Sequence, residues 1–247
     1  MRNKKKTLII PDTHGRTFWK GPVETYGDEV EKIVFLGDYV DPYTSLEGIT
    51  VEEAISNFRE ILELKGKTPD KVVLLYGNHD LHYAFKSVPK TSRYSEIHAT
   101  EIRKLFKDNS ELFSLAHSET IGGNRYLLTH AGMMKGWYAD NSDFIGAPTD
   151  ENLNNLSNSE HGLRIMWEMS KYRRWLSRSR FGSIVWSDIR ERTDATDSDQ
   201  YTPDGWPAYQ IFGHTQLIQR PSITDEWACI DCRSGFVLTD NGLIIQV

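Results

Sequence analysis

Five apolar runs in this sequence end in polar residues of the kinds that bind metal ions, and each of these ends lies beside a glycine. In KIVFLGDYVDPY, for example, two carboxylates follow the apolar run at a spacing of three residues. Burying carboxylates, amides and imidazoles together is costly unless a positive charge accompanies them. This donor mixture favours Mn, Fe, Zn or Co over Ca or a thiolate site. The residues concerned are Asp12, His14, Asp38, Asp41, Asn78, His79, Asp80, His130 and His214.

The apolar runs are predicted to be buried strands that alternate with helices. Residues 7–10, 33–36 and 72–76 form the first three predicted strands. A helix is predicted over residues 51–65, with Thr50 and Glu53 as a capping box and Gly66 as its stop. This rhythm indicates α/β units, in which the carboxyl ends of the strands face the ligand crevice. We therefore expect the polar residues to converge although they lie far apart in the sequence.

The rest of the chain continues the mixed pattern. A helix is predicted over residues 95–107, and strands are predicted directly before His130 and His214. Residues 133–182 are helical and aromatic in character, and Asp240-Asn241-Gly242 indicates a hairpin near the end of the chain. The sequence predicts a single domain over residues 1–247, with a helical insert at about 133–182.

Composition argues against some functions, such as bulk nucleic-acid binding, and indicates in which compartment the protein is expected. The chain has 247 residues and a net charge of −6, which argues against a bulk electrostatic grip on nucleic acid. Two cysteines, Cys229 and Cys232, complete neither a zinc site nor a disulfide scaffold, so a reducing cytoplasm is expected. The three apolar residues before Pro11 are too few for a signal-peptide core, and no run reaches the length of a membrane span.

The motifs DTHG, GDYVD, GNHD, THAG and GHT resemble the five successive signatures of the calcineurin-like metallophosphoesterases. They occur in the order of that family across residues 12–215. GDYVD and VWSD, at residues 185–188, are similar to motifs of the phosphoprotein phosphatases. Within that family, the sequence most resembles the branch that contains the phosphoprotein phosphatases and their bacterial relatives that cut dinucleoside polyphosphates. The resemblance implies an α/β fold, a β-sandwich flanked by helices in αββα order.

The resemblance also implies a site with two divalent metal ions, manganese foremost and iron or zinc as alternatives. Asp38 would bridge the metals, with Asp12 and His14 on the first. Asn78, His130 and His214 would complete the second. His79 would be the general acid, oriented by Asp41. A pair of cations lowers the pKa of a water, the resulting hydroxide attacks phosphorus, and an imidazolium protonates the leaving oxygen.

Two departures from the family pattern concern metal and phosphate binding. Gly213-His214-Thr215-Gln216 lacks the second histidine of the common G-H-x-H motif, which leaves the first metal with fewer ligands. Pro42 stands where the phosphatases have an arginine that binds phosphate. Arg16, in the same loop as His14, is our first candidate to replace it, and Arg233 is the second.

The basic segment at residues 171–180 has two interpretations, a lid over an anionic substrate or a solvated helix face. Its apolar residues, together with Ile165 and Met169, form a helical stripe in the sequence. The histidines outside the motifs, among them His82, are expected to be structural or surface residues.

The leading functional hypothesis is a phosphomonoesterase that acts on a phosphoprotein or a small phosphorylated molecule. The alternatives are a dinucleoside polyphosphate pyrophosphohydrolase, an RNA-end phosphatase or 2′,3′-cyclic phosphodiesterase, and a non-catalytic scaffold. A nucleic-acid substrate is therefore open but not favoured, and no membrane partner is expected.

Overall fold

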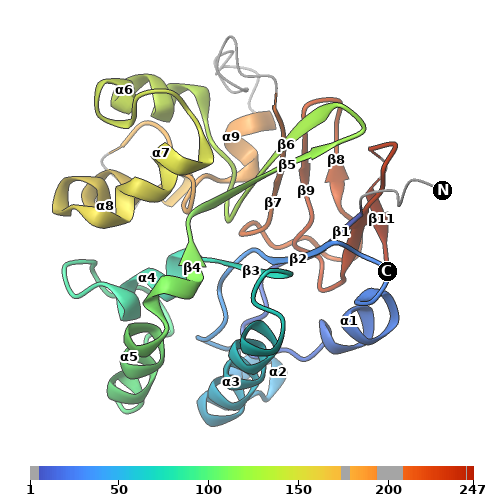
Figure 1. Cartoon of the computed structure of the whole chain (residues 1–247). Helices are drawn as coiled ribbons and strands as arrows, with labels where there is room; N and C mark the ends of the chain where they lie inside the picture. Colours follow the sequence, from blue (N-terminus) through green and yellow to red (C-terminus); the bar gives the residue numbers. More distant parts are fainter. Residues whose placement is uncertain (1–5, 174–178, 194–207, 243) are drawn as a thin grey trace. The chain divides into compact units, whose positions relative to one another are not determined.

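The computed structural model describes residues 6–173, 179–193, 208–242 and 244–247. The chain divides into two compact units. The first comprises Met1–Ser114 with Arg233–Val247, and the second comprises Leu115–Cys232. Each unit contains one β-sheet and its own helices, labelled in Figure 1. The predicted α/β class with two sheets flanked by helices is therefore confirmed.

The sheet of the first unit has six strands in the order β11-β10-β1-β2-β3-β4. β1, β2, β3 and β4 are mutually parallel, whereas β10 runs antiparallel to β1 and β11 antiparallel to β10. The predicted strands and the terminal hairpin are thus present, with ends shifted by about one residue. The strands are β1 (Thr7–Ile10), β2 (Lys32–Phe35), β3 (Val72–Leu75), β4 (Phe113–Ser114), β10 (Phe236–Leu238) and β11 (Ile244–Gln246).

The helices of the first unit are set by capping groups and by aromatic packing. Thr50 and Glu53 form the predicted capping box at the start of α3. Phe58 of this helix packs against Tyr39 and Phe106, each with ring centroids 4.9 Å apart. The helices are α1 (Lys20–Tyr26), α2 (Thr44–Glu47), α3 (Val51–Lys67), α4 (Asn78–Ala84), α5 (Ala99–Asp108) and the 3₁₀ turn η1 (Ser110–Leu112).

Two predicted helix ends are wrong, for identifiable reasons. The helix α3 continues through Gly66 to Lys67, because Thr68 satisfies the carbonyl of Leu64 with both its backbone N–H and its hydroxyl. The helix α5 begins at Ala99 and not at residue 95. The backbone N–H of Ser95 donates instead to the hydroxyl of Tyr83 at 2.8 Å, which holds this residue in the preceding loop.

The sheet of the second unit has five strands in the order β5-β6-β7-β9-β8. β6, β7 and β9 are parallel, and β5 forms an antiparallel hairpin with β6. The sequence pattern did not predict β5, whose residues AHSETI are mostly polar. The strands are β5 (Ala116–Ile121), β6 (Asn124–Thr129), β7 (Ala208–Phe212), β8 (Ser222–Ile223) and β9 (Trp227–Cys229).

The helices of the second unit lie mainly between β6 and β7, where the insert is predicted. They are α6 (Lys135–Ile145), α7 (Asp150–Asn154), η2 (Asn155–Asn158), α8 (Glu160–Met166), η3 (Lys171–Arg173) and α9 (Ile189–Thr193). The predicted apolar stripe does not lie on one helix, because α8 ends at Met166. Residues 174–178 of the basic segment lie outside the described residues, and the domain boundaries stay a prediction. No helix within the described ranges is long and apolar enough to cross a membrane.

Candidate active site

The first unit brings Asp12, His14 and Asp38 together where the parallel strands β1 and β2 end. One donor atom from each residue lies within 4.8 Å of the others, and all three residues are buried. His14 donates its Nδ1–H to the carbonyl of Val40 at 3.0 Å, so its Nε2 carries the lone pair and lies 3.3 Å from Asp38 Oδ2. A backbone hydrogen bond of this kind commonly fixes the tautomer of a metal-binding histidine.

Electrostatics in this cluster favour a neutral His14 and set two buried carboxyl groups, Asp38 and Asp80, against each other. Burial lowers the pKa of His14 well below 6.5, and the neighbouring Arg93 and His79 lower it further. A neutral imidazole is the form that binds a metal ion. Burial and the nearby Asp38 carboxylate raise the pKa of Asp80 well above its usual value. A cation beside these buried acids would relieve their repulsion, so the residues present fit a divalent metal.

The Asp80 carboxylate ties the loop after β2 to the loop after β3. It accepts backbone N–H groups from Asp38 at 2.7 Å, Gly77 at 2.8 Å and Tyr39 at 3.0 Å. The Oδ1 atom of Asp38 in turn accepts the N–H of His79 at 2.8 Å. A Cβ atom at Gly77 would lie 2.1 Å from that Oδ1 atom, so only glycine permits this approach.

Asp41 contacts His79, which the family resemblance implies it orients, and two further side chains. Its Oδ2 atom lies 2.8 Å from His79 Nδ1, and its Oδ1 atom accepts the Tyr83 hydroxyl at 2.7 Å. His82 Nε2 lies 2.9 Å from the same Oδ2, although it is not aligned for a hydrogen bond. The other nitrogen of His82 accepts the N–H of Thr91 at 3.2 Å. His82 is fully buried and therefore belongs to this cluster. The sequence did not indicate this, because His82 lies in none of the family motifs.

The second unit brings His130 and His214 together by the same strand-end geometry. They follow the parallel strands β6 and β7, and His130 Nε2 lies 3.2 Å from His214 Nδ1. The N–H of Gly213 donates to the carbonyl of His130 at 2.7 Å. Trp186 packs edge-on to the His214 ring at 5.6 Å between centroids.

The VWSD motif supports the loop that carries His130. The Ser187 hydroxyl donates to the carbonyls of Ala131 at 2.5 Å and Gly132 at 2.9 Å. The adjacent Asp188 carboxylate is almost fully buried and accepts two hydrogen bonds from Arg190, at 2.7 and 2.8 Å. In this structure the motif thus positions the loop backbone.

A family model described as calcineurin-like phosphoesterase matches residues 5–216, which is most of the chain. The chain belongs to the calcineurin-like phosphoesterase family. It is therefore a metal-dependent hydrolase of phosphate esters, and the clusters described above are its candidate metal ligands.

Solved structures of phosphoesterases are among those similar to this chain. A serine/threonine phosphatase from Saccharomyces cerevisiae, with similarity to human phosphatase PP5, is 13% identical with a TM-score of 0.52. The match covers 96% of this chain and 73% of the phosphatase, which shows a shared fold. An archaeal phosphodiesterase is 13% identical with a TM-score of 0.40, over 98% of both chains. No curated protein matches the sequence.

Arg16 and Arg233, the predicted phosphate-binding residues of this phosphoesterase, both contact Glu47. Arg16 donates to it from Nε at 2.7 Å and from Nη2 at 2.9 Å. Arg233 Nη2 lies 2.7 Å from Glu47 Oε1. The hydrogen bond from Arg16 is the main cause of a lowered Glu47 pKa. Two guanidinium groups from opposite ends of the chain therefore share one carboxylate.

Arg93 is a residue of this site that the sequence analysis missed. Its Nη2 atom lies 2.9 Å from His79 Nε2, and its Nη1 atom donates to the backbone carbonyl of Asp41 at 2.7 Å. Its guanidinium carbon lies 3.7 Å from the centroid of the Tyr43 ring. Arg93 lies in the loop between α4 and α5, outside every motif, so no local signal in the sequence indicates it.

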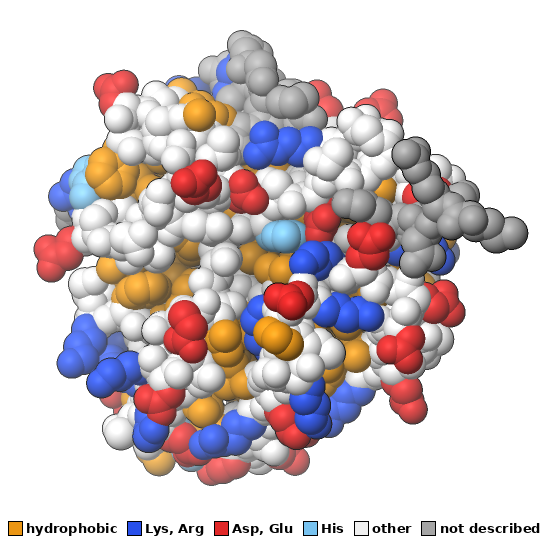
Figure 2. Space-filling model, in the orientation of Figure 1, with side chains coloured by type: hydrophobic (Ala, Val, Ile, Leu, Met, Phe, Trp, Pro, Cys, Tyr) orange, Lys and Arg blue, Asp and Glu red, His pale blue; other side chains and the backbone are white. Residues whose placement is uncertain are grey.

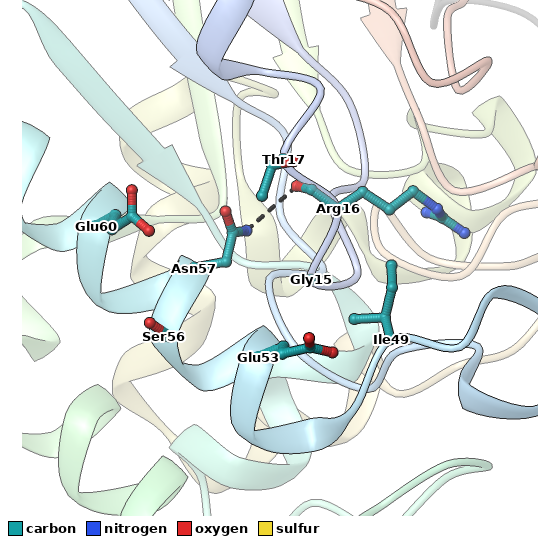
Figure 3. A pocket seen from close by; sticks show the side chains of 8 residues that line it. All are labelled: Gly15, Arg16, Thr17, Ile49, Glu53, Ser56, Asn57 and Glu60. Carbon is teal, nitrogen blue, oxygen red and sulfur yellow. Dashed lines mark hydrogen bonds between the residues drawn. The ribbon is translucent and has the colours of Figure 1, made fainter.

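A cavity of about 310 Å³ lies beside the loop of Arg16 but does not suit a phosphate. Figure 3 shows the carboxylates of Glu53 and Glu60 among its lining residues. The Arg16 side chain points away from the cavity, while its backbone carbonyl accepts a hydrogen bond from Asn57 at 3.3 Å. An anion would meet like charge in this cavity.

Backbone strain gathers on the site residues. Among the described residues, six that are not glycine have positive φ angles. Five of them are predicted site residues, and the sixth is Arg93. Strained backbone of this kind clusters at functional sites. The residues are His14 (45°), Asp38 (54°), Asp41 (59°), Arg93 (66°), His214 (65°) and Arg233 (61°).

Proposed function

We propose that this phosphoesterase hydrolyses phosphomonoesters with two divalent metal ions, manganese foremost, and with His79 as the general acid. The observation that carries the proposal is the His79–Asp41 pair, 2.8 Å apart, beside the Asp12, His14 and Asp38 cluster. The rings of His14 and His79 meet edge to face at 5.2 Å between centroids. A proton donor and a metal-binding cluster are thus neighbours within one unit.

The proposed metal ligands follow the family motifs. By the family resemblance, Asp12 and His14 would hold the first metal and Asp38 would be shared. Asn78, His130 and His214 would complete the second. The close approach of those two histidines supports their pairing in this role. When bound, the metals would supply an activated water and neutralise phosphate charge.

His79 is proposed to transfer a proton through its Nε2 atom. Asp41 accepts the Nδ1–H, so the remaining nitrogen is the one that can serve the leaving oxygen. The buried carboxylate orients the ring and stabilises its protonated form. Tyr83 in turn donates to Asp41 and restrains the carboxylate.

The proposed substrate is a phosphoprotein or a small phosphorylated molecule. Arg16 and Arg233 are proposed to bind substrate phosphate through donors that Glu47 does not use. The alternative of a dinucleoside polyphosphate substrate is favoured by one observation, which is that Arg16, Arg93 and Arg233 gather around Glu47 and Tyr43 in the first unit. Several guanidinium groups suit more than one phosphate.

A nucleic-acid substrate is not favoured by the charge distribution. The net charge is −6, and Figure 2 shows Lys and Arg side chains interspersed with Asp and Glu on the visible face. A continuous basic track is the usual footprint of a protein that binds nucleic acid.

The experiment that tests this function compares His79→Asn with the unaltered enzyme on aryl phosphates of increasing leaving-group pKa, with manganese added. General acids contribute about 10²–10⁴-fold to the rate, so kcat should fall by about this factor on the poorest leaving groups. The loss should be much smaller on p-nitrophenyl phosphate, which needs little protonation. Metal content measured by mass spectrometry should stay unchanged.

The exposed His161, changed to asparagine, is the matched control and should leave kcat unaltered. Equal losses of kcat on good and poor leaving groups would remove His79 from the proposed role. A panel of phosphopeptides, mononucleotides, dinucleoside polyphosphates, cyclic nucleotides and RNA ends would then separate the substrate classes.

A further inference from the structure

We propose that Arg93 binds a phosphoryl oxygen of the substrate directly, in the place of the arginine that is missing at Pro42. This inference rests on the proposed hydrolysis of phosphate esters and adds a substrate-binding residue that lies outside every motif of the sequence.

The guanidinium of Arg93 is held against the backbone next to position 42, where the phosphatases have their arginine. Pro42 is buried and carries no donor. Arg93 Nη1 donates at 2.7 Å to the carbonyl of Asp41, the group bonded directly to the Pro42 nitrogen. A distant segment of the chain therefore supplies positive charge where position 42 does not.

The same guanidinium lies next to the proposed general acid and close to a proposed metal ligand. Its Nη2 atom lies 2.9 Å from His79 Nε2, the nitrogen that would serve the leaving group. It covers the ring of Tyr43, which meets the ring of His14 edge-on at 5.3 Å between centroids. A phosphate ester that reaches His79 beside the metal-binding cluster must therefore come within reach of Arg93.

Arg93 makes no ion pair within the described part of the chain, although Glu47 is near enough to interact with its charge. Its contacts are a carbonyl, an imidazole and an aromatic face. Among the residues that the structure describes, no carboxylate oxygen pairs with Arg93, whereas Arg16 and Arg233 both pair with Glu47. A guanidinium without a carboxylate partner can offer two parallel N–H groups to a phosphate.

The loop that carries Arg93 is held in place by the partners of Asp41. Tyr94 stacks on Tyr83 with centroids 4.7 Å apart, and the N–H of Ser95 donates to the Tyr83 hydroxyl at 2.8 Å. Arg93 itself adopts a φ of 66°, and five of the predicted site residues also have positive φ angles in their own loops. A substrate would therefore find this guanidinium already positioned, which lowers the entropic cost of binding.

The test measures inorganic phosphate binding to the manganese-loaded protein by calorimetry, alongside KM for p-nitrophenyl phosphate and metal content. Arg93→Ala should weaken phosphate binding about tenfold or more and raise KM by a similar factor, with metal content unchanged. Arg93→Lys should recover only part of the loss, because an ammonium makes no paired contact. The matched control is Arg59→Ala, an exposed arginine of α3 paired with Glu101, which should change neither value.

A double variant separates direct binding from an effect through His79. In a His79→Asn background, Arg93→Ala should still weaken phosphate binding by the same factor. Unchanged phosphate affinity in either background would overturn the direct contact, while hydrolysis by the unaltered enzyme would leave the proposed function standing. An enzyme that binds phosphate through Arg93 but hydrolyses no monoester would instead overturn the proposed function alone.

Discussion

At the scale of single residues, Glu47 and Tyr43 organise the arginines of the first unit. Glu47 pairs with Arg16 and Arg233, while the Tyr43 ring has Arg93 at 3.7 Å and Arg16 at 5.3 Å from its centroid. Arg16 is buried, so its contact with Glu47 is well shielded from solvent. The three guanidinium groups thus differ in their partners, and their substitutions should differ in effect.

Arg16→Ala should raise KM for phosphomonoesters tenfold or more, about 1.4 kcal/mol, while metal content stays constant. Arg16→Lys should restore part of the binding because the lysine keeps the charge but not the planar geometry. Steady-state kinetics and metal analysis measure both effects. Glu47→Gln is the informative companion. It should lower or preserve KM if the arginines bind phosphate, whereas the same rise as in Arg16→Ala would show that Arg16 acts only by holding Glu47.

At the scale of secondary-structure elements, the short helix α9 is anchored by a buried acid. Glu191 is fully buried, and both of its carboxylate oxygens lie 3.2 Å from the backbone nitrogen of Gly182. Burial is the main cause that raises the pKa of Glu191 from 4.5 to about 7, and Asp188 adds to the shift. Ionisation of this side chain is therefore unfavourable in the folded unit.

The sign of the resulting pH dependence follows from this shift. The folded protein holds a proton on Glu191 that the unfolded chain releases above pH 4.5, so stability falls as pH rises from 4.5 to about 7. Relative to Glu191→Gln, the unaltered protein should lose on the order of 3 kcal/mol of unfolding free energy across this window. Urea denaturation at several pH values measures the difference. The exposed Glu151, changed to glutamine, is the control, and parallel pH profiles for Glu191→Gln and the unaltered protein would contradict the assignment.

At the scale of the whole molecule, the proposed metal ligands are distributed over both compact units. Asp12, His14, Asp38 and Asn78 belong to the first, whereas His130 and His214 belong to the second.

The purified protein should carry, or bind on addition, about two transition-metal ions per chain. Asp38→Asn should lower the occupancy of both metals, because this carboxylate is proposed to be shared, whereas His214→Ala should chiefly remove one. Elemental analysis of dialysed protein gives the stoichiometry, with the exposed His161→Ala as control. Full occupancy in both variants would refute the ligand assignment.

The local sequence was enough to predict the strands of the site and the types of residue that are proposed to bind metal at their ends. Parallel strands place their carboxyl ends at one edge of a sheet, so local apolar runs were enough to predict that Asp12, His14 and Asp38 would meet. The contact between Asp41 and His79 was expected from the family resemblance and not from strand geometry. These features depend on short segments whose pattern is visible in the chain.

The side chains that surround those residues could be identified only in the folded protein. Loops and short helices bring Arg93, His82 and Glu47 to the site. The sequence pattern of such segments does not predict the direction of a side chain. The start of α5 likewise depends on a hydrogen bond from Ser95 to the Tyr83 hydroxyl, a contact between two elements that no periodicity predicts. Strand ends are specified locally by apolar runs, but a guanidinium at the end of a long side chain is placed by long-range contacts.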